Sequence, residues 1–163
     1  MEALAGHHDR SRFDSGSEPL DRYLRQHASQ DLRRRVARVF VAFPGGSHEI
    51  AGFYTLSAGS IERATLPPET ARRLPHYPLP VALIGRLAVD RRWSGQGLGS
   101  ALLADACGRV VRASAALAVY AVVVDAREAR AQRFYEHFGF IELPHSERRM
   151  FYPLAAIEPM IDA

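Results

Sequence analysis

The sequence predicts a single α/β (α+β) domain over residues 1–163, with a mixed central sheet of six to seven strands and about four helices. Three observations support this prediction. The chain has 163 residues, of which 47% are hydrophobic, and this suits one core but not two. Near the middle, two apolar segments flank one with helical spacing, which is typical of a βαβ unit. Nearer the amino end, alternating segments predict an antiparallel hairpin.

The amino-terminal elements begin with a helix. It is expected to start at Glu18, because Ser17 can cap it and residues of one face follow at helical spacing: Leu20, Tyr23, Leu24 and His27. Residues 36–43 then alternate and contain β-branched and aromatic side chains, which favours a strand. Residues 50–61 are interpreted as the returning strand of a hairpin with a longer loop.

The central elements follow a stiff connection, because five of the ten prolines lie between residues 67 and 80. We expect a short helix there, around residues 69–74. Residues 81–89 are almost all apolar and predict a strand covered on both faces. Helical spacing predicts a helix over about 97–114, and residues 117–125 predict a second buried strand, parallel to the first.

The carboxyl-terminal elements are one more helix and two short strands. The helix is expected at about 126–137, with an aromatic stripe, and Gly139 is a suitable residue to end it. The strands are expected near 140–143 and 148–153. The only cysteine, Cys107, lies in the central helix, where we interpret it as a small core residue, with a reactive thiol as the alternative.

The composition and the distribution of apolar residues limit the partners and the location that can be expected for this chain. All 21 lysine-plus-arginine positions are arginine, which reflects either codon bias or a phosphate-rich partner. The net charge of +3 permits a nucleic acid partner without requiring one. No apolar stretch approaches the ~20 residues of a membrane-spanning helix, and the first residues lack the apolar core of a signal peptide. We therefore expect a cytoplasmic protein with no membrane partner.

A glycine loop lies between the first central strand and its helix, with glycine at alternate positions: Gly95, Gly97 and Gly99. A nucleotide-binding P-loop needs a lysine, which this sequence lacks, and a dinucleotide G-x-G-x-x-G motif fails because Ser100 and Leu102 occupy its last position. The remaining pattern is R-x-x-G-x-G, which begins at Arg92. Here backbone N–H groups at a helix start can hold a pyrophosphate that side chains would obstruct.

Two stretches of the sequence carry a family resemblance. "GRLAVDRRWSGQGLGSALLADA" and "ARAQRFYEHFGF" resemble the GNAT acetyltransferases, whose acetyl-CoA loop is [QR]-x-x-G-x-[GA]. Over about residues 13–153 the chain also resembles the toxin acetyltransferases of bacterial toxin–antitoxin pairs. It departs from them at Ser15, where relatives often have cysteine. The resemblance implies a single GNAT fold with a central βαβ acetyl-CoA unit, and a toxin that acetylates the α-amino group of aminoacyl-tRNA.

The resemblance also implies a cofactor site without a metal, with acetyl-CoA as the co-substrate. The amine attacks the thioester directly, the Val89 N–H polarises the thioester carbonyl, and amides of residues 94–100 hold the pyrophosphate. The implied cofactor-binding residues are Leu87, Ala88, Val89, Arg92, Ser94, Gly95, Gln96, Gly97, Leu98, Gly99, Ser100, Asp125 and Phe134. Tyr135 is the implied general acid for the departing thiolate, and the alternative is an aromatic core residue.

Arginines are the candidate contacts to tRNA, and the alternative for each is a solvated surface charge. The candidates are Arg33, Arg34, Arg35, Arg38, Arg86 and Arg91. For Arg86 the residues themselves favour function, because a charge inside an apolar strand must either be paired or face a ligand. The expected protein partners are a ribbon–helix–helix antitoxin and a second copy in a homodimer.

Two other functions stay open on the sequence. A GNAT enzyme that acetylates a small-molecule amine or a protein N-terminus would share the cofactor site and differ in the arginine surface. A non-catalytic CoA-binding or interaction module would be insensitive to Tyr135→Phe.

Overall fold

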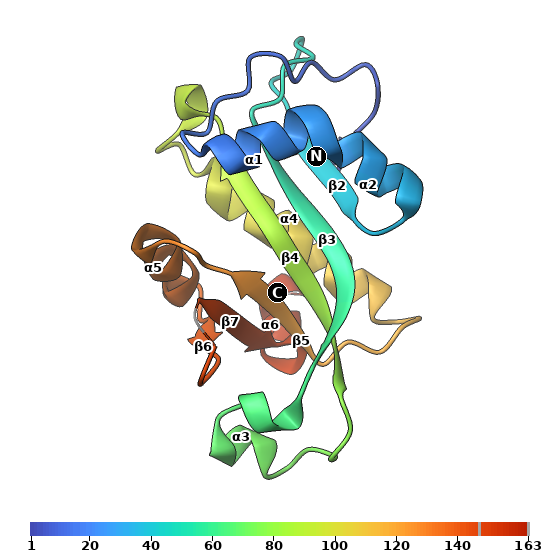
Figure 1. Cartoon of the computed structure of the whole chain (residues 1–163), viewed down its shortest axis with the longest axis vertical. Coiled ribbons are helices and arrows are strands. Elements are labelled where there is room, and N and C mark those ends of the chain that lie inside the picture. Colours follow the sequence, from blue (N-terminus) through green and yellow to red (C-terminus); the bar gives the residue numbers. More distant parts are fainter. Residues whose placement is uncertain (147, 163) are drawn as a thin grey trace. The chain divides into compact units, whose positions relative to one another are not determined.

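The computed structural model describes residues 1–146 and 148–162. Hydrogen bonds join its strands into one sheet in the order β1-β2-β3-β4-β5-β7-β6 (Figure 1). The prediction of six to seven strands is therefore confirmed, with seven strands in the sheet. The strands are β1 (Glu2–Ala3), β2 (Arg38–Ala42), β3 (Gly52–Ile61), β4 (Leu79–Val89), β5 (Ala121–Asp125), β6 (Ile141–Glu142) and β7 (Arg149–Pro153).

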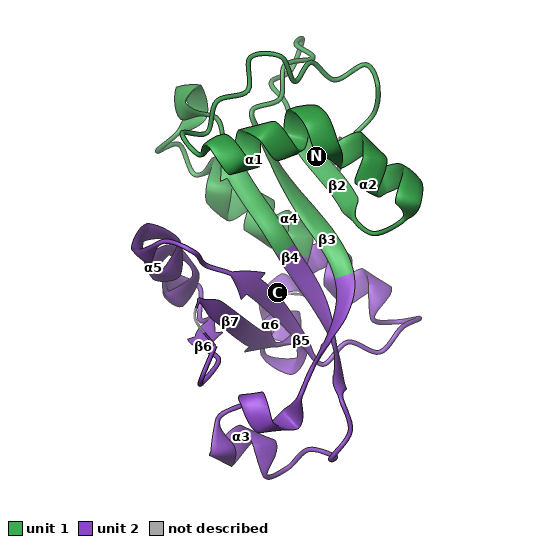
Figure 2. Ribbon diagram, viewed as in Figure 1, with its two compact units in different colours: residues 1–57, 85–106 green, residues 58–84, 107–163 purple. Residues whose placement is uncertain are grey.

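The chain forms two compact units (Figure 2). Unit 1 contains residues 1–57 and 85–106, and unit 2 contains residues 58–84 and 107–163. The boundary passes through β3, β4 and the long helix α4 (Leu98–Ala113). Unit 1 therefore holds the carboxyl end of β4 and the start of α4, where the glycine loop lies.

In unit 1, β1, β2 and β3 form an antiparallel meander, which confirms the predicted hairpin. A continuous helical segment crosses these strands (Figure 1). It consists of α1 (Glu18–Arg22), a π-helical turn (Tyr23–His27) and α2 (Ala28–Arg34). The start at Glu18 is as predicted, although the Ser17 side chain makes no capping hydrogen bond.

The π-helical turn corrects the predicted apolar face of this first helix. A π turn has one more residue than an α turn, so it shifts every later side chain along the helix surface. As a result Ala28 is fully buried and His27 is exposed, where the spacing predicted His27 on the buried face. The core under the segment includes Phe13, Tyr23 and Phe53.

In unit 2, β4 pairs in parallel with β5, as predicted for the βαβ unit. Strand β7 then pairs antiparallel with β5, and β6 lies at the edge. The helices of this unit, besides the end of α4, are α3 (Pro68–Ala71), α5 (Ala129–His137) and α6 (Leu154–Ile161). In the described residues no helix is both long and apolar enough to cross a membrane.

The differences from the predicted elements of unit 2 have local causes. Strand β5 begins at Ala121, not at residue 117, because residues 114–117 fold back on the end of α4 through bonds such as Leu117 N–H to Ala113 C=O (3.0 Å). Helix α5 begins at Ala129, three residues later than expected. Helix α6 was not predicted. Its inner side chains, Leu154 and Ile157, are buried.

Candidate active site

The glycine loop connects β4 to α4 within unit 1. After β4 comes Asp90, then a 3₁₀ turn (Arg91–Trp93), then two glycines with positive φ, Gly95 (+74°) and Gly97 (+81°). A Cβ added at either glycine would meet no heavy atom within 4 Å, so the backbone conformation and not crowding by the chain requires glycine here. The surface of the loop is therefore open, and the first N–H groups of α4 lack intrahelical partners.

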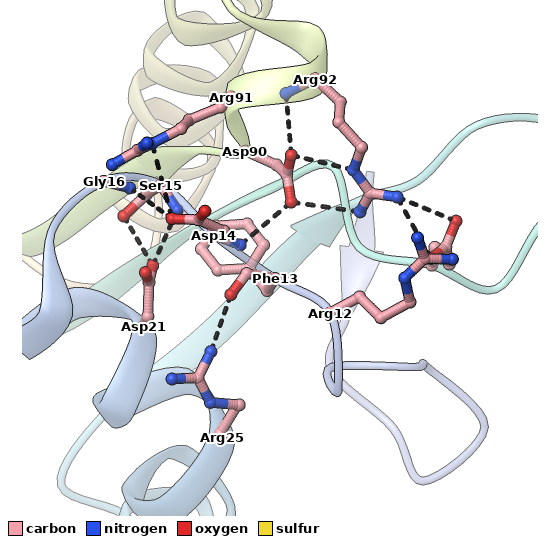
Figure 3. A network of polar contacts seen from close by, with 11 residues as sticks. Arg12, Phe13, Asp14, Ser15, Gly16, Asp21, Arg25, Asp90, Arg91 and Arg92 are labelled. Carbon is pink, nitrogen blue, oxygen red and sulfur yellow. Dashed lines mark hydrogen bonds and ion pairs between the residues drawn. The ribbon is translucent and has the colours of Figure 1, made fainter.

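Asp90 anchors this loop, and its side chain is 1% exposed (Figure 3). Its carboxylate accepts hydrogen bonds from the Arg92 N–H (2.9 Å), from Arg92 Nε and Nη2 (both 3.1 Å) and from the Asp14 N–H (3.1 Å). Burial by itself would raise the pKa of Asp90, but the bonds from Arg92 and Asp14 outweigh it and lower that pKa. The carboxylate is therefore ionised and holds the loop against the amino-terminal segment.

Arg92 was predicted to bind the cofactor, and its guanidinium donates hydrogen bonds to two carboxylates of the chain. Besides Asp90, its Nη1 contacts both carboxylate oxygens of Glu49 at 3.3 Å. These bonds, chiefly the one to Asp90, raise the pKa of Arg92. In the structure this side chain holds the loop, and its contact to the cofactor stays a prediction.

The segment around Ser15 completes the network that holds the loop (Figure 3). The Arg91 N–H donates to the Asp14 C=O (2.9 Å), and the Arg91 guanidinium lies 3.6 Å from the Asp14 carboxylate. Asp21, 5% exposed, accepts from both the N–H (3.0 Å) and the Oγ (2.6 Å) of Ser15. A serine at this position is thus a strong donor to a buried carboxylate, whereas a cysteine would be a weak one.

Three cofactor-binding candidates lie at the end of β4 and alternate between its faces. Ala88 is 5% exposed and belongs to the core beneath the first helical segment. Leu87 and Val89 are half-buried and point to the opposite face, because successive side chains of a strand alternate. Beside the loop is a hollow of about 300 Å³ with mostly apolar walls, lined by Ala42, Phe43, Pro44, Ala51, Trp93, Gln96, Gly97, Leu98 and Ala101.

Tyr135 lies on α5 in unit 2 and is 5% exposed. Its ring contacts those of Phe134 and Phe140, with centroids 5.1 and 5.4 Å away. Burial, with a smaller contribution from the negative charge of Asp125, raises the pKa of Tyr135 well above its usual value. The phenol is therefore protonated throughout the neutral range.

The hydroxyl of Tyr135 has no hydrogen-bond partner within residues 1–146 and 148–162. The other buried tyrosines differ, since Tyr23 donates to Asp31 and Tyr54 donates to Asp105. Among the described residues every fully buried side-chain oxygen or nitrogen has a hydrogen-bond partner, so the Tyr135 oxygen is not fully enclosed. The hydroxyl of this buried residue is therefore available for a ligand.

The other two candidates in unit 2 have different surroundings. The Asp125 carboxylate accepts a hydrogen bond from Arg149 Nε at 3.1 Å, directly across the pair of strands β5 and β7. Sequence reasoning placed Asp125 at the cofactor and missed this ion pair. Phe134 is half-buried and packs against Phe138 as well as Tyr135.

The candidate tRNA-binding arginines fall into two groups. Four are exposed at the end of α2 and the start of β2, and in the described part of the chain none of them has a carboxylate within 4.0 Å: Arg33, Arg34, Arg35 and Arg38. Arg91 is exposed but lies beside Asp14, and Arg86 is half-buried with its guanidinium over the ring of Tyr23. The first group therefore carries uncompensated positive charge.

One group of residues brings possible metal-ligating atoms together: Glu2, His7 and His8. The Nδ1 of His8 accepts a hydrogen bond from the Ala5 N–H (2.9 Å), which places the ring proton on Nε2, and Nε2 donates to Glu2 Oε1 (2.8 Å). In this tautomer His8 offers no lone pair to an ion.

Comparisons with known proteins place this arrangement among acetyltransferases. A family model described as Acetyltransferase (GNAT) domain matches residues 35–142. A tRNA-acetylating toxin of Mycobacterium tuberculosis is 42% identical over 132 residues, which are 81% of this chain and 78% of that protein.

Two solved structures of toxins are similar over nearly the whole chain. AtaT complexed with acetyl-methionyl-tRNAfMet has a TM-score of 0.90 and 33% identity, over 98% of this chain and 96% of that one. A mutant of AtaT bound to the C-terminus of the antitoxin AtaR and acetyl-CoA has a TM-score of 0.86 and 30% identity, over 99% of this chain and 97% of that one.

Proposed function

This chain belongs to the GNAT family of acetyltransferases, and we propose that it is a toxin that transfers the acetyl group of acetyl-CoA to the α-amino group of aminoacyl-tRNA. Such a transfer blocks translation, because an acetylated amine cannot form the next peptide bond. The observation that carries the chemistry is the protonated hydroxyl of Tyr135, a buried residue whose hydroxyl has no partner in the described chain. The similarity to tRNA-acetylating toxins supports the choice of acceptor.

The glycine loop would hold the cofactor. Amides of residues 94–100 face an open surface at the start of α4, where the helix dipole favours the charge of a pyrophosphate. The backbone of Leu87, Ala88 and Val89 would hold the pantetheine arm. The Val89 N–H would donate to the thioester oxygen as negative charge develops on it, and one such preorganised donor is worth about 3 kcal/mol.

The transfer needs a neutral amine and a protonated leaving group. The amine nitrogen attacks the thioester carbon, the C–N bond forms, the C–S bond breaks, and the sulfur leaves with the electron pair. An α-amino group with a pKa of ~7.8 costs about 1 kcal/mol to deprotonate at neutral pH, so it needs no strong base. The Tyr135 hydroxyl would give its proton to the thiolate, the nitrogen would lose one proton to solvent as the amide forms, and the phenolate would take one up from solvent.

Cys107 shows how burial in unit 2 changes the basicity of a thiolate. A free thiol has a pKa of ~8.5 and a phenol ~10, so in water the proton would stay on the phenol. Burial in unit 2 raises the pKa of the Cys107 thiol to about 11. A coenzyme thiolate that leaves in a similarly apolar site would be a stronger base than in water, but burial also raises the pKa of Tyr135, so burial by itself does not bring the two pKa values together.

The unpaired arginines at residues 33–38 are proposed to bind tRNA phosphates. Their four charges have no carboxylate partners in the described chain, so a polyanion would compensate them. Replacing all four with alanine should weaken tRNA binding and reduce the slope of log K against log salt by about 3 to 4. An unchanged slope would assign these arginines to solvent or to another partner.

The proposed reaction is tested with labelled acetyl-CoA and total aminoacyl-tRNA. We expect label in the tRNA fraction and, after mild base has cleaved the ester, on an N-acetyl amino acid. Deacylated tRNA is the control and should take up none. Label that appears only on free amines would contradict the proposal and favour a small-molecule acetyltransferase, and no transfer at all would favour a CoA-binding module.

The partners and the location follow from the same proposal. AtaT binds the C-terminus of its antitoxin AtaR, and we propose a comparable antitoxin here, with a ribbon–helix–helix DNA-binding part. We further propose a homodimer, and the cytoplasm as the site of action, because aminoacyl-tRNA is used there. Light scattering of the purified protein, alone and with a ribbon–helix–helix antitoxin, tests both assemblies.

A further inference from the structure

Arg86 is a half-buried cation in an apolar strand, at the unit 1 end of β4. Its backbone N–H donates to Thr55 Oγ1 at 3.1 Å, which fixes the strand at this point. Its guanidinium carbon lies 3.6 Å from the centre of the Tyr23 ring. In the residues that the structure describes, no carboxylate lies within 4.0 Å of this guanidinium.

The ring beneath Arg86 is rigidly held. Tyr23 is 5% exposed, and its hydroxyl donates to Asp31 Oδ2 at 2.9 Å. Its ring stacks on Phe53 with an interplanar angle of 16°, and Phe53 is fully buried. Burial, together with the bond to Asp31, raises the pKa of Tyr23 to about 12, so the phenol is neutral. Arg86 therefore lies on a fixed aromatic support.

This geometry leaves the donors of Arg86 free for a ligand. Stacking uses a face of the guanidinium, whereas its N–H groups lie in the plane. Other half-buried arginines make hydrogen bonds inside the chain: Arg149 donates to Asp125, and Arg10 and Arg63 donate to backbone carbonyls. A half-buried charge that lacks such a partner favours an anionic ligand.

The position of Arg86 along β4 relates that ligand to the reaction. Arg86 immediately precedes Leu87, the first of the three residues proposed to hold the pantetheine arm. Because side chains alternate along a strand, Arg86 points to the same face as Ala88, towards the first helical segment, and away from the face of Leu87 and Val89. The anion would thus bind beside the acyl group, on the other face of the same strand.

We propose that Arg86 binds a phosphodiester of the 3′ end of aminoacyl-tRNA, and that Tyr23 is a positioning residue which holds the guanidinium flat for this contact. The inference rests on the proposed function and adds a role for one side chain in recognising the acceptor. A phosphate is favoured because a planar guanidinium fork matches its two free oxygens. Amines without phosphate would gain nothing from Arg86.

The test compares two acceptors, aminoacyl-tRNA and an amino acid methyl ester that carries no phosphate. For Arg86→Gln we expect KM for aminoacyl-tRNA to rise about 10- to 100-fold, the usual range for a lost charged hydrogen bond, with kcat within a few-fold. Kinetics with the methyl ester, and the Kd for acetyl-CoA, should stay within twofold. Arg86→Lys should be intermediate, because it keeps the charge and loses the planar fork.

The role of the Tyr23 ring and the effect of losing any one positive charge are tested with separate variants. Tyr23→Leu should behave like Arg86→Gln, whereas Tyr23→Phe keeps the stacked ring and should leave KM within about threefold. Arg22→Gln is the matched control, because Arg22 is exposed and lies near Glu18, and the substitution removes one positive charge from the helical segment that carries Tyr23.

Each contrary result has a distinct meaning. If the wild type acetylates aminoacyl-tRNA and Arg86→Gln does so with unchanged KM, the inference fails and the proposed function stands. If the methyl ester reaction falls equally, Arg86 is structural and the inference again fails. Lost binding of an acidic antitoxin peptide, with unchanged tRNA kinetics, would assign Arg86 to a protein partner. If the wild type does not acetylate aminoacyl-tRNA, the proposed function itself fails.

Discussion

The two regions that carry the proposed chemistry satisfy their polar groups in opposite ways. Around Asp90 in unit 1, a buried carboxylate accepts four hydrogen bonds, and the cations near it are paired. Around Tyr135 in unit 2, aromatic rings pack against the ring of a tyrosine whose hydroxyl has no partner in the described chain. The first arrangement holds a backbone loop in shape before any ligand arrives, and the second keeps one proton donor uncommitted. Preorganisation and reactivity are thus assigned to different side chains.

Tyr135→Phe removes the uncommitted proton donor and should have the largest effect of the substitutions. We expect turnover to fall about 10²- to 10⁴-fold, the usual contribution of a general acid, with an unchanged Kd for acetyl-CoA. Steady-state kinetics and calorimetry measure the two quantities. Tyr54→Phe is the matched control, because it removes a buried hydroxyl that is already bonded. It should cost about 1 to 2 kcal/mol of stability and less than threefold in turnover.

If Tyr135→Phe kept full turnover, the catalytic assignment would be wrong. Tyr135 would then be a core aromatic residue of the α5 stripe.

Asp90→Ala removes the carboxylate that anchors the glycine loop and should chiefly lower the stability of the fold. It leaves the Arg92 guanidinium and the Asp14 N–H without their main partner, and the loss of hydrogen bonds to a buried charged group costs about 1.5 to 3 kcal/mol. Urea unfolding of the variant measures this. Glu49→Gln removes the outer, more exposed partner of Arg92 and should cost less than 1 kcal/mol. Equal effects of the two substitutions would contradict the central role of Asp90.

Gly97→Ala should sharpen the comparison by separating loop shape from loop anchoring. Alanine at a φ of +81° costs about 1 to 2 kcal/mol, whereas the added methyl group has open space. We expect acetyl-CoA to bind about tenfold more weakly, by calorimetry. Gly46→Ala is the control, since it has a similar φ (+79°) and open surroundings in another loop. It should cost similar stability and leave cofactor affinity unchanged, and a loss of affinity there would refute the loop assignment.

Alkaline titration should give the smallest effect and test how apolar unit 2 is. The folded pKa of Cys107 is about 11, above its unfolded value, so its thiol contributes stability that is present at neutral pH and lost as the pH rises. Between pH 9 and pH 10 the loss should be about 1 kcal/mol. Chemical unfolding of the wild type and of Cys107→Ala across this range should show a steeper decline of the unfolding free energy with pH for the wild type. Equal slopes would show that the thiol is accessible to water.

Much of the fold and part of the site could be predicted because they depend on local pattern. Strand and helix periodicity predicted the hairpin, the parallel βαβ unit and the helix that carries Tyr135. The glycines at 95 and 97 and the absence of lysine reduced the possible loops to one. The family resemblance then supplied the cofactor and the acceptor. Element ends were less accurate, as at residues 117–120, because turn contacts compete with strand propensity.

The tertiary structure decided which groups pair with the polar side chains. Arg92 pairs with Glu49, 43 positions away, and Asp125 pairs with Arg149, 24 positions away, and neither pairing follows from spacing. The π-helical turn that buries Ala28 in place of His27 likewise depends on packing against the sheet. The sequence by itself determined which residues could carry charge or a proton. Only the folded chain decided which of them are already compensated, because hydrogen bonds and desolvation depend on neighbours that the fold brings together.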